Sequence, residues 1–486
     1  MELYLKGLAS GYEPEHVARL FFPGLQLAKH YPARGADLIL VHVAGGRVLA
    51  AVRQQGRCTA RWESLPEDSA RQEKEYLVCR TLFLLLREVT GKCPPWGMLT
   101  GVRPVRLVHD LRRKGEAEAD IRAFFTQRNF VSEEKYRRCT EIADHQKSVL
   151  AGNTPRSYSL YISIPFCPSR CSYCSFVSRT TAQSAGLIAP YVDRLCQEIA
   201  AIAALAERLG LRLETVYIGG GTPTALSAGQ LRQLMETVAR CFDLSAVSEY
   251  TVEAGRPDCT TPEKLAVLKA LGATRISINP QTLSDEVLAA IGRRHTAQDV
   301  LDCFAAARRL GHDNINMDLI AGLPQDTPQR FAESLAGVIA LEPENVTVHT
   351  LTLKRASNLV IDHAAAQYGD VEQMLASCRQ LDGAGYAPYY LYRQKGTLQN
   401  LENTGYTKPG KMGLYNIFIM EEVHTILSAG AGGSTKLVAP GGRIERIFNY
   451  KYPTEYLSGF DTILERKRGV EEFYGKFFDL DPETAG

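Results

Sequence analysis

The sequence predicts an α/β protein built on a partial, TIM-like (β/α)6 barrel, with an N-terminal α/β and helical domain and a C-terminal α+β cap. From Ser159 onward, short apolar stretches alternate with helical ones. Six such units in series imply a parallel sheet, because parallel neighbours need crossover connections. Polar or glycine-rich residues follow the ends of these strands, which is the rim where barrel enzymes place their chemistry. Six units, rather than the usual eight, indicate an incomplete barrel.

Each expected element follows from its own hydrophobic pattern. The expected strands are Ser159–Ile164, Thr215–Ile218, Glu249–Glu253, Arg275–Asn279, Asn314–Leu319 and Asn345–Leu351. The expected helices between them are Tyr191–Leu209, Ser227–Cys241, Pro262–Leu271, Ala297–Leu310 and Thr327–Leu341.

The N-terminal part of the chain has a different pattern. Two alternating apolar runs, Asp37–Val43 and Val48–Val52, flank a Gly-Gly pair and predict a β-hairpin. A helix is expected over Ala70–Val89, and two or three more helices precede a linker at Gly152–Pro155. We therefore expect three domains, at residues 1–152, 153–355 and 356–486, the last of them a cap over the barrel mouth.

Composition narrows the class of protein. The chain has 486 residues, of which 45% are apolar, and a formal net charge of +2. This charge gives no general reason to expect nucleic acid or an anionic membrane surface as a partner. The twelve cysteines are scattered, which suits a reducing cytoplasm better than a disulfide scaffold. We find no signal peptide and no apolar stretch long enough to span a bilayer, so a cytoplasmic location is expected.

The most informative motif is Cys167-Pro-Ser-Arg-Cys171-Ser-Tyr-Cys174. Three thiolates can hold three irons of a cubane cluster and leave the fourth iron open, whereas a cluster that only carries electrons normally takes four. An open iron can bind a substrate or cofactor directly. The alternatives are three reduced core cysteines, or a zinc site that would need a fourth ligand. No Cys or His close to the motif supplies that ligand.

Several further stretches resemble the radical S-adenosylmethionine (SAM) superfamily. Within it, the chain is similar to the oxygen-independent coproporphyrinogen III oxidase group, which also contains heme-chaperone-like proteins. The stretches that carry this resemblance are Tyr161–Cys167, Tyr217–Thr224, Arg275–Gln281, Gly292–His295 and Asp318–Pro324. Two flanking stretches, Pro95–Val105 and Asn403–Gly410, resemble the HemZ branch of the group.

The resemblance implies a [4Fe–4S] cluster on Cys167, Cys171 and Cys174, and SAM bound to its open iron. The positions that match SAM-binding ones are Tyr161, Tyr173, Gly220, Gly221, Thr222, Glu253, Gln281, Arg293, Asp318 and Leu351. Without the cysteines, the glycines would read as a turn, Glu253 and Asp318 as helix caps, and Arg293 as a surface charge. A low-potential electron donor of the flavodoxin or ferredoxin type is implied as a partner.

In the oxidases of the group, a 5′-deoxyadenosyl radical removes a hydrogen from a propionate of a tetrapyrrole, and loss of carbon dioxide and one electron leaves a vinyl group. Carboxylates of this kind call for Arg or Lys. The candidate cations are Arg103, Arg106, Arg393, Lys408 and Lys411. A tyrosine cluster at 386, 389, 390 and 392 either stacks on the tetrapyrrole or packs on the core.

Two departures from the group keep three functions open. Ser175 stands where the oxidases have a further cysteine, and Tyr415-Asn416 stands where the chaperones have a histidine. His424 could replace that histidine or be structural. The hypotheses are a coproporphyrinogen III dehydrogenase, a heme carrier, and a radical SAM methyltransferase of anaerobic heme breakdown. The expected substrate residues are Tyr392, Lys408, Lys411, Tyr415 and Asn416.

Overall fold

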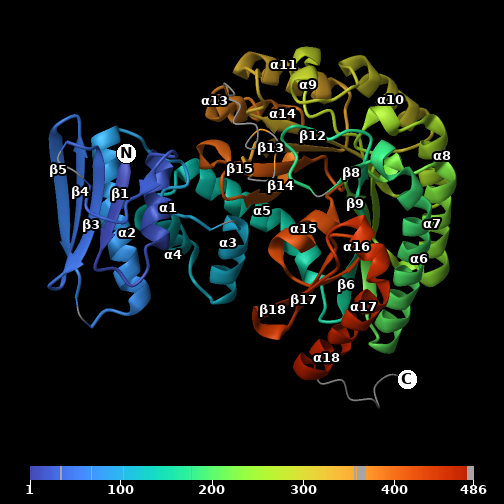
Figure 1. Cartoon of the computed structure of the whole chain (residues 1–486), viewed down its shortest axis with the longest axis horizontal. Helices are drawn as coiled ribbons and strands as arrows, with labels where there is room; N and C mark the ends of the chain where they lie inside the picture. The colour runs from blue at the N-terminus through green and yellow to red at the C-terminus, as the bar shows by residue number, and fades with distance from the viewer. Residues whose placement is uncertain are drawn as a thin grey trace. The chain divides into compact units, whose positions relative to one another are not determined.

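A computed structural model describes residues 1–32, 35–66, 68–101, 103–176, 178–354, 357, 359 and 368–478. The chain forms two compact units (Figure 1). The first comprises Met1–Thr140, Arg393–Lys395 and Gln399–Leu401, and the second comprises Glu141–Tyr392, Gly396–Leu398 and Glu402–Gly486. Every helix among the described residues is too short or too polar to cross a membrane.

The first unit has one five-stranded sheet, in the order β2-β1-β3-β4-β5. Its strands are β1 (Glu2–Lys6), β2 (Gln26–Leu27), β3 (Leu38–Ala44), β4 (Arg47–Gln54) and β5 (Arg57–Ser64). The expected hairpin is confirmed as β3 and β4. It turns at Gly45 and Gly46, whose φ angles of 53° and 68° suit glycine in a two-residue hairpin loop.

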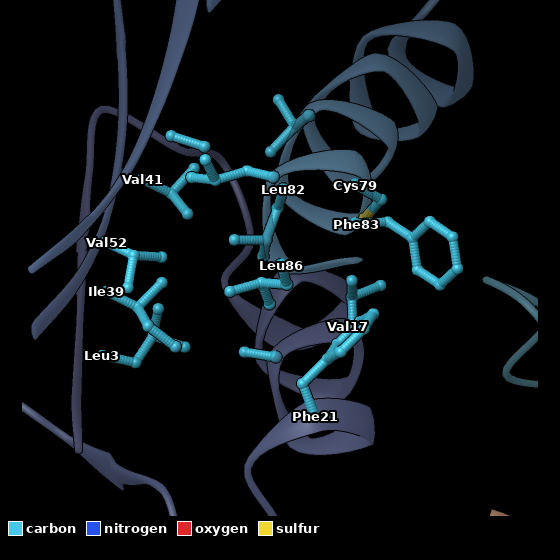
Figure 2. Packing of buried hydrophobic residues seen from close by; sticks show 14 of the residues in the cluster. Leu3, Val17, Phe21, Ile39, Val41, Val52, Cys79, Leu82, Phe83 and Leu86 are labelled. Atoms are coloured by element: carbon cyan, nitrogen blue, oxygen red, sulfur yellow. The ribbon is translucent and has the colours of Figure 1, made fainter. Parts of the chain in front are cut away.

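Two helices, α1 (Tyr12–Phe21) and α2 (Arg71–Thr90), provide the other half of this unit's core. Figure 2 shows Leu82 and Leu86 of α2 facing Val41, Val52 and Ile39 of the sheet, with Val17 and Phe21 of α1 lower in the view. The expected helix over Ala70–Val89 is thus confirmed. The chain continues through α3 (Pro104–Arg113), α4 (Glu118–Ala123), a π-helical turn (Phe124–Arg128) and α5 (Glu133–Ala151).

The second unit contains the expected barrel strands. They lie side by side in chain order within one sheet, and all of their mutual pairs are parallel. They are β6 (Ser157–Ile164), β9 (Arg212–Gly220), β10 (Glu249–Glu253), β11 (Arg275–Ser277), β12 (Ile315–Ala321) and β13 (Asn345–Thr350). Two further short strands, β7 (Phe166–Cys167) and β8 (Arg179–Thr180), pair with each other.

Helices connect these strands and surround their outer side (Figure 1). They are α6 (Ala185–Arg208), α7 (Ala228–Cys241), α8 (Pro262–Ala270), α9 (Asp285–Ala290), α10 (Ala297–Arg309) and α11 (Pro328–Ala340). Side-chain caps fix where several begin. Ser227 and Thr296 form capping boxes with Gln230 and Asp299, so α7 and α10 start where the sequence predicts.

The C-terminal segment continues the barrel's own sheet at both edges. Strands β14 (Ala387–Arg393) and β15 (Glu402–Thr407) extend the edge at β13, while β16 (Thr425–Ala429), β17 (Ser434–Val438) and β18 (Ile444–Phe448) extend the edge at β6. An edge strand has unpaired N–H and C=O groups that such additions satisfy. The helices of this segment are α13 (Val371–Ala376), α14 (Arg379–Gly383), α15 (Leu414–Glu421), α16 (Pro453–Ser458), α17 (Phe460–Arg466) and α18 (Arg468–Phe477).

The partial barrel with an N-terminal α/β domain is therefore confirmed. The boundaries at 152 and 355 stay predictions. The C-terminal strands are part of the barrel's sheet, where the sequence suggested a cap above it.

Candidate active site

The three motif cysteines lie on one segment, residues 167–174, which begins with the last residue of β7 and is called the cysteine loop below. Cys171 is buried, and Cys167 and Cys174 are half-buried. The Cys174 N–H donates to the Cys171 carbonyl at 3.1 Å, so the loop turns and gathers its side chains. Burial raises the pKa of Cys174 to about 11, and the nearby Cys171 and Cys167 raise it too. Bare thiolates would repel one another here, and binding to iron removes that cost.

Neighbouring elements contact the cysteine sulfurs. The Thr222 hydroxyl lies 3.5 Å from Cys167 Sγ, and the Arg256 guanidinium lies 3.5 Å from Cys171 Sγ. Arg293 donates to the Tyr173 hydroxyl at 3.1 Å. The buried Arg293 is therefore not a surface charge. Such outer-shell donors orient metal ligands and tune them. Thr222, Tyr173 and Arg293 were expected in the site from the sequence, whereas Arg256 was not.

Gly220 and Gly221 form a cradle against the cysteine loop. Gly220 has a φ of +113°, a backbone conformation that glycine adopts readily and that other residues rarely adopt. A Cβ on Gly221 would lie 2.7 Å from the Phe166 carbonyl and 2.9 Å from Cys167 Sγ. The glycines thus do more than make a turn, because they let the backbone approach the sulfur closely.

These observations fit a [4Fe–4S] cluster. The loop offers three thiols, polar donors reach two of the sulfurs, and the glycine backbone leaves space beside them. Within the described ranges, no group of three or more His, Cys, Asp or Glu side chains is arranged to hold a metal ion. A zinc ion needs its ligands around a single point. Three thiolates of a cubane cluster bind three separate irons and converge less closely.

Two carboxylates lie near the carboxyl ends of the barrel strands. Glu253 ends β10 and accepts a hydrogen bond from the Tyr217 hydroxyl at 2.6 Å. Asp318 of β12 accepts one from Asn316 Nδ2 at 2.7 Å and lies 3.7 Å from His349 Nε2. Neither carboxylate caps a helix, since Thr261 and Thr327 cap the helices that follow.

Gln281 lies at the same rim, in the segment that follows β11, and its backbone is hydrogen-bonded to β12. Its N–H donates to the Asp318 carbonyl at 2.8 Å, and its own carbonyl accepts from Ile320 N–H at 2.9 Å. Its φ of +70° is unusual for a side-chain-bearing residue. Leu351, 3% exposed, belongs to an apolar cluster against which Tyr173 packs. The structure therefore brings the expected SAM-binding side chains to one rim.

The pKa of Glu253 leads to a prediction about how SAM binding depends on pH. Burial raises its pKa to about 7, although the Tyr217 hydrogen bond opposes the shift. The carboxyl is then protonated below pH 7 and loses acceptor capacity and charge. We expect SAM to bind roughly tenfold more weakly at pH 6 than at pH 8, because one unit below a pKa leaves about a tenth ionised. Calorimetry of wild type and Glu253→Gln measures this. The ionisation of SAM itself affects binding to both proteins equally. Parallel pH profiles of the SAM affinity for wild type and Glu253→Gln would therefore contradict the role of Glu253 in binding SAM.

Three tyrosines stack inside the barrel behind these carboxylates. The Tyr217 ring lies 4.4 Å from Tyr415 and 6.1 Å from Tyr161, between ring centroids. Tyr415 is buried, and neighbouring Asn416 donates to the Tyr389 hydroxyl at 3.1 Å. Tyr217 was missed by sequence analysis, although its register partner in β6 is Tyr161, so the two rings share a face. Of the two predicted substrate residues, Tyr415 thus belongs to the ring stack, and its N–H donates to Glu249 at the start of β10, whereas Asn416 is half-buried beside Tyr389.

The expectation that Lys408 and Lys411 bind substrate carboxylates is wrong. Strand β15 runs antiparallel to β13, and Thr407 pairs with Asn345, the first residue of β13. Lys408 therefore lies at the amino end of the barrel strands, away from the cysteine loop. Its Nζ donates to the Glu342 carbonyl at 3.1 Å, and Lys411 Nζ lies 3.6 Å from Asp313.

The tyrosine cluster is mostly core, as the second interpretation had it. Tyr389 is fully buried, and Tyr390 is 4% exposed, because both pack against Ile417. Tyr386 is also buried and donates to the Pro343 carbonyl. Tyr392 differs: it is half-buried, and its hydroxyl lies 3.4 Å from His349 Nδ1, which links it to Asp318. It stays a predicted substrate residue.

The guanidinium of Arg393 is hydrogen-bonded to backbone carbonyls of the first unit, to which Arg393 itself belongs. It is 3% exposed, and it donates to the carbonyls of Leu99, Gly101 and Asn400. These bonds make it structural and unsuited to a substrate carboxylate. Arg103 and Arg106 lie in the same unit, and their role toward a substrate stays a prediction.

His424 is structural. It is 3% exposed, with its ring nitrogens 2.8 Å from Ser159 Oγ and 2.6 Å from Asn153 Oδ1. Burial lowers its pKa to about 3. Both nitrogens already have partners, so neither is available to heme iron.

Comparison with known proteins identifies the family. Residues 161–336 match the model of the Radical SAM superfamily. The oxygen-independent coproporphyrinogen-III oxidase-like protein HemZ of Bacillus subtilis (strain 168) is 39% identical over 401 residues, which cover 81% of this chain and 80% of the relative. The chain belongs to this HemZ family of radical SAM proteins. Its cofactors are the [4Fe–4S] cluster and SAM of the superfamily.

Two further proteins are similar to parts of the chain. The heme chaperone HemW of Bacillus subtilis (strain 168) is 40% identical over 197 residues, 40% of this chain and 51% of that protein. The structure of coproporphyrinogen III oxidase (HemN) from Escherichia coli superposes with a TM-score of 0.52 at 24% identity, over 66% of this chain and 72% of the other. This second likeness supports the fold.

Proposed function

We propose that this HemZ-family chain is a radical SAM oxidoreductase that converts coproporphyrinogen III propionates to vinyl groups without oxygen. The observation that carries the proposal is the cysteine loop, with polar donors on two of its sulfurs, placed at the same rim as Glu253 and Asp318. This is the arrangement that a SAM-cleaving cluster needs. The names of the HemZ and HemN relatives supply the substrate class.

Each residue has a definite task in this proposal. Cys167, Cys171 and Cys174 hold the cluster, and Gly220 and Gly221 bring backbone groups to SAM. When bound and reduced, the cofactors supply a carbon-centred oxidant able to remove a hydrogen atom from an unactivated C–H bond.

The side chains around the cofactors fix SAM and exclude water. Glu253 and Asp318 are suited to the amino and ribose hydroxyl groups of SAM, and Arg293 to its carboxylate. The stacked rings of Tyr161, Tyr217 and Tyr415 fill the barrel interior with apolar surface, which limits access of water to the reacting groups. A low-potential flavodoxin or ferredoxin would supply the electron.

A heme carrier is the second candidate, because HemW relatives are named heme chaperones. The geometry around α15 disfavours it. Tyr415 replaces the histidine of the chaperone motif and is buried in a ring stack, while both nitrogens of His424 are occupied. A methyltransferase acting on heme would use the same cofactors, and the choice between substrates rests on product analysis.

One anaerobic assay tests the proposal. The full chain is reconstituted with iron and sulfide and mixed with SAM, a strong reductant and coproporphyrinogen III, and products are read by mass spectrometry. We expect loss of two carboxyl groups together with 5′-deoxyadenosine. Formation of 5′-deoxyadenosine with unchanged porphyrinogen would show that coproporphyrinogen III is not the substrate. Heme is then supplied, and a methylated linear product would identify the methyltransferase. A stable Soret shift without turnover would identify the carrier.

A further inference from the structure

Arg256 is a buried guanidinium beside the cluster to which neither the sequence nor the family comparison assigns a role. It lies three residues after Glu253, directly before the short 3-10 helix Pro257–Cys259, and is 4% exposed. A charge buried to this degree is stable only where hydrogen-bonding partners compensate it. The identity of those partners indicates what Arg256 does.

One side of the guanidinium is fixed by Asp258. Nε donates to Asp258 Oδ1 at 2.9 Å and Nη2 donates to Oδ2 at 2.7 Å, which is a bidentate pair. His295 Nδ1 lies 3.8 Å from the same carboxylate. Burial acts to raise the pKa of Asp258, but His295 and Arg256 together hold it well below its usual range. The carboxylate therefore stays ionised at neutral pH and keeps the guanidinium in one orientation.

The other side of the guanidinium reaches the cysteine loop. Nη2 donates to Ser169 Oγ at 2.9 Å, and Nη1 lies 3.4 Å from the Ser169 carbonyl and 3.5 Å from Cys171 Sγ. Arg256 thus joins the β10 loop to the loop that carries all three cluster ligands. Its planar, fixed set of donors suits this bridging geometry, which the single ammonium of lysine cannot reproduce.

We propose that Arg256 is a positioning residue of the cluster, which orients the Cys171 thiolate and raises the reduction potential of the cluster through the N–H···S contact. Hydrogen bonds to cluster sulfurs and nearby charge set the potentials of iron–sulfur centres. A permanent positive charge at Cys171 stabilises the reduced, more negative form of the cluster. The reduced state that must form before SAM is cleaved becomes accessible to a milder electron donor. The role does not depend on which tetrapyrrole is the substrate.

A redox titration of the full, reconstituted chain tests this role. Wild type, Arg256→Gln, Arg256→Lys and Arg294→Gln are titrated anaerobically without SAM, with the reduced cluster followed by electron paramagnetic resonance and iron counted per chain. Arg294 is the control, because it is an exposed arginine two residues after Gly292, whose carbonyl accepts a hydrogen bond from Ser169 of the cysteine loop. We expect a lower midpoint potential in Arg256→Gln, a smaller decrease in Arg256→Lys, and no change in Arg294→Gln.

Two results would overturn the proposal. Equal midpoint potentials in wild type and Arg256→Gln, at equal iron content, would reduce Arg256 to a structural bridge between loops. If Arg256→Gln fails to retain its iron, the midpoint potential of Arg256→Lys is compared with wild type instead. This variant keeps the positive charge and loses the planar set of guanidinium donors. A wild-type potential in that variant would contradict the role given to the N–H···S contact, because the positive charge alone would then be enough. Failure of the coproporphyrinogen assay alone would leave these potentials unaffected.

Discussion

Replacing Cys171 with serine is expected to remove the cluster and abolish cleavage of SAM. A serine hydroxyl is a harder and shorter ligand than a thiolate, and Cys171 is the most buried of the three cysteines. Loss of an outer-shell partner alone typically costs about 10–100-fold in metal affinity or activity, so loss of a ligand should exceed about 100-fold. The measurements are iron per chain after anaerobic reconstitution and the rate of 5′-deoxyadenosine formation.

Cys58→Ser is the matched control for this experiment. Cys58 is an exposed cysteine of the first unit, remote in sequence from the cysteine loop. It should retain wild-type iron content and rate. Iron retention with undiminished 5′-deoxyadenosine formation in Cys171→Ser would show that the motif does not hold the catalytic cluster.

The second large effect is expected at Gly221. A methyl group there would lie 2.7 Å from the Phe166 carbonyl and 2.9 Å from Cys167 Sγ, so the cysteine loop must move. Overpacking of this kind costs about 1–3 kcal/mol in the free energy of unfolding. We expect Gly221→Ala to lower iron content and weaken SAM binding by about tenfold or more, since a tenfold change corresponds to about 1.4 kcal/mol, which is within that range.

A second glycine supplies the control. Gly229 lies in α7, and a Cβ there would be 3.9 Å from Ser227 Oγ, which is an ordinary contact. Gly229→Ala should bind SAM normally and be more stable by less than about 1 kcal/mol, because alanine has a higher helix propensity than glycine and position 229 lies in the first turn of α7. Equal SAM affinity in Gly221→Ala and wild type would contradict the cradle.

Much of the barrel could be predicted from the sequence because local and global signals agree there. Strand Glu249–Glu253 has the predicted bounds, and Ser227 and Thr296 start their helices through capping boxes. The site followed from the same pattern. Carboxyl ends of parallel strands meet at one rim, so Glu253 and Asp318 were expected near the cysteines.

The wrong or missing predictions concern residues whose position depends on the direction of a strand or on contacts with distant parts of the chain. Lys408 follows a strand that could have run either way beside β13, and its antiparallel direction puts the lysine at the opposite end. Arg256 contacts a cysteine 85 residues earlier in the chain, and no local pattern marks that contact. The strand carrying Tyr389 and Tyr390 is buried on both faces, which a run of tyrosines does not reveal.

The most direct test of the proposed activity uses coproporphyrinogen III labelled with deuterium at the propionate carbon next to the ring, the position from which hydrogen must leave to form the vinyl group. The reconstituted full chain is given SAM and reductant anaerobically, and the nucleoside and porphyrin products are analysed by mass spectrometry. We expect 5′-deoxyadenosine carrying one deuterium, formed together with the vinyl product. Unlabelled 5′-deoxyadenosine beside intact porphyrinogen would contradict it.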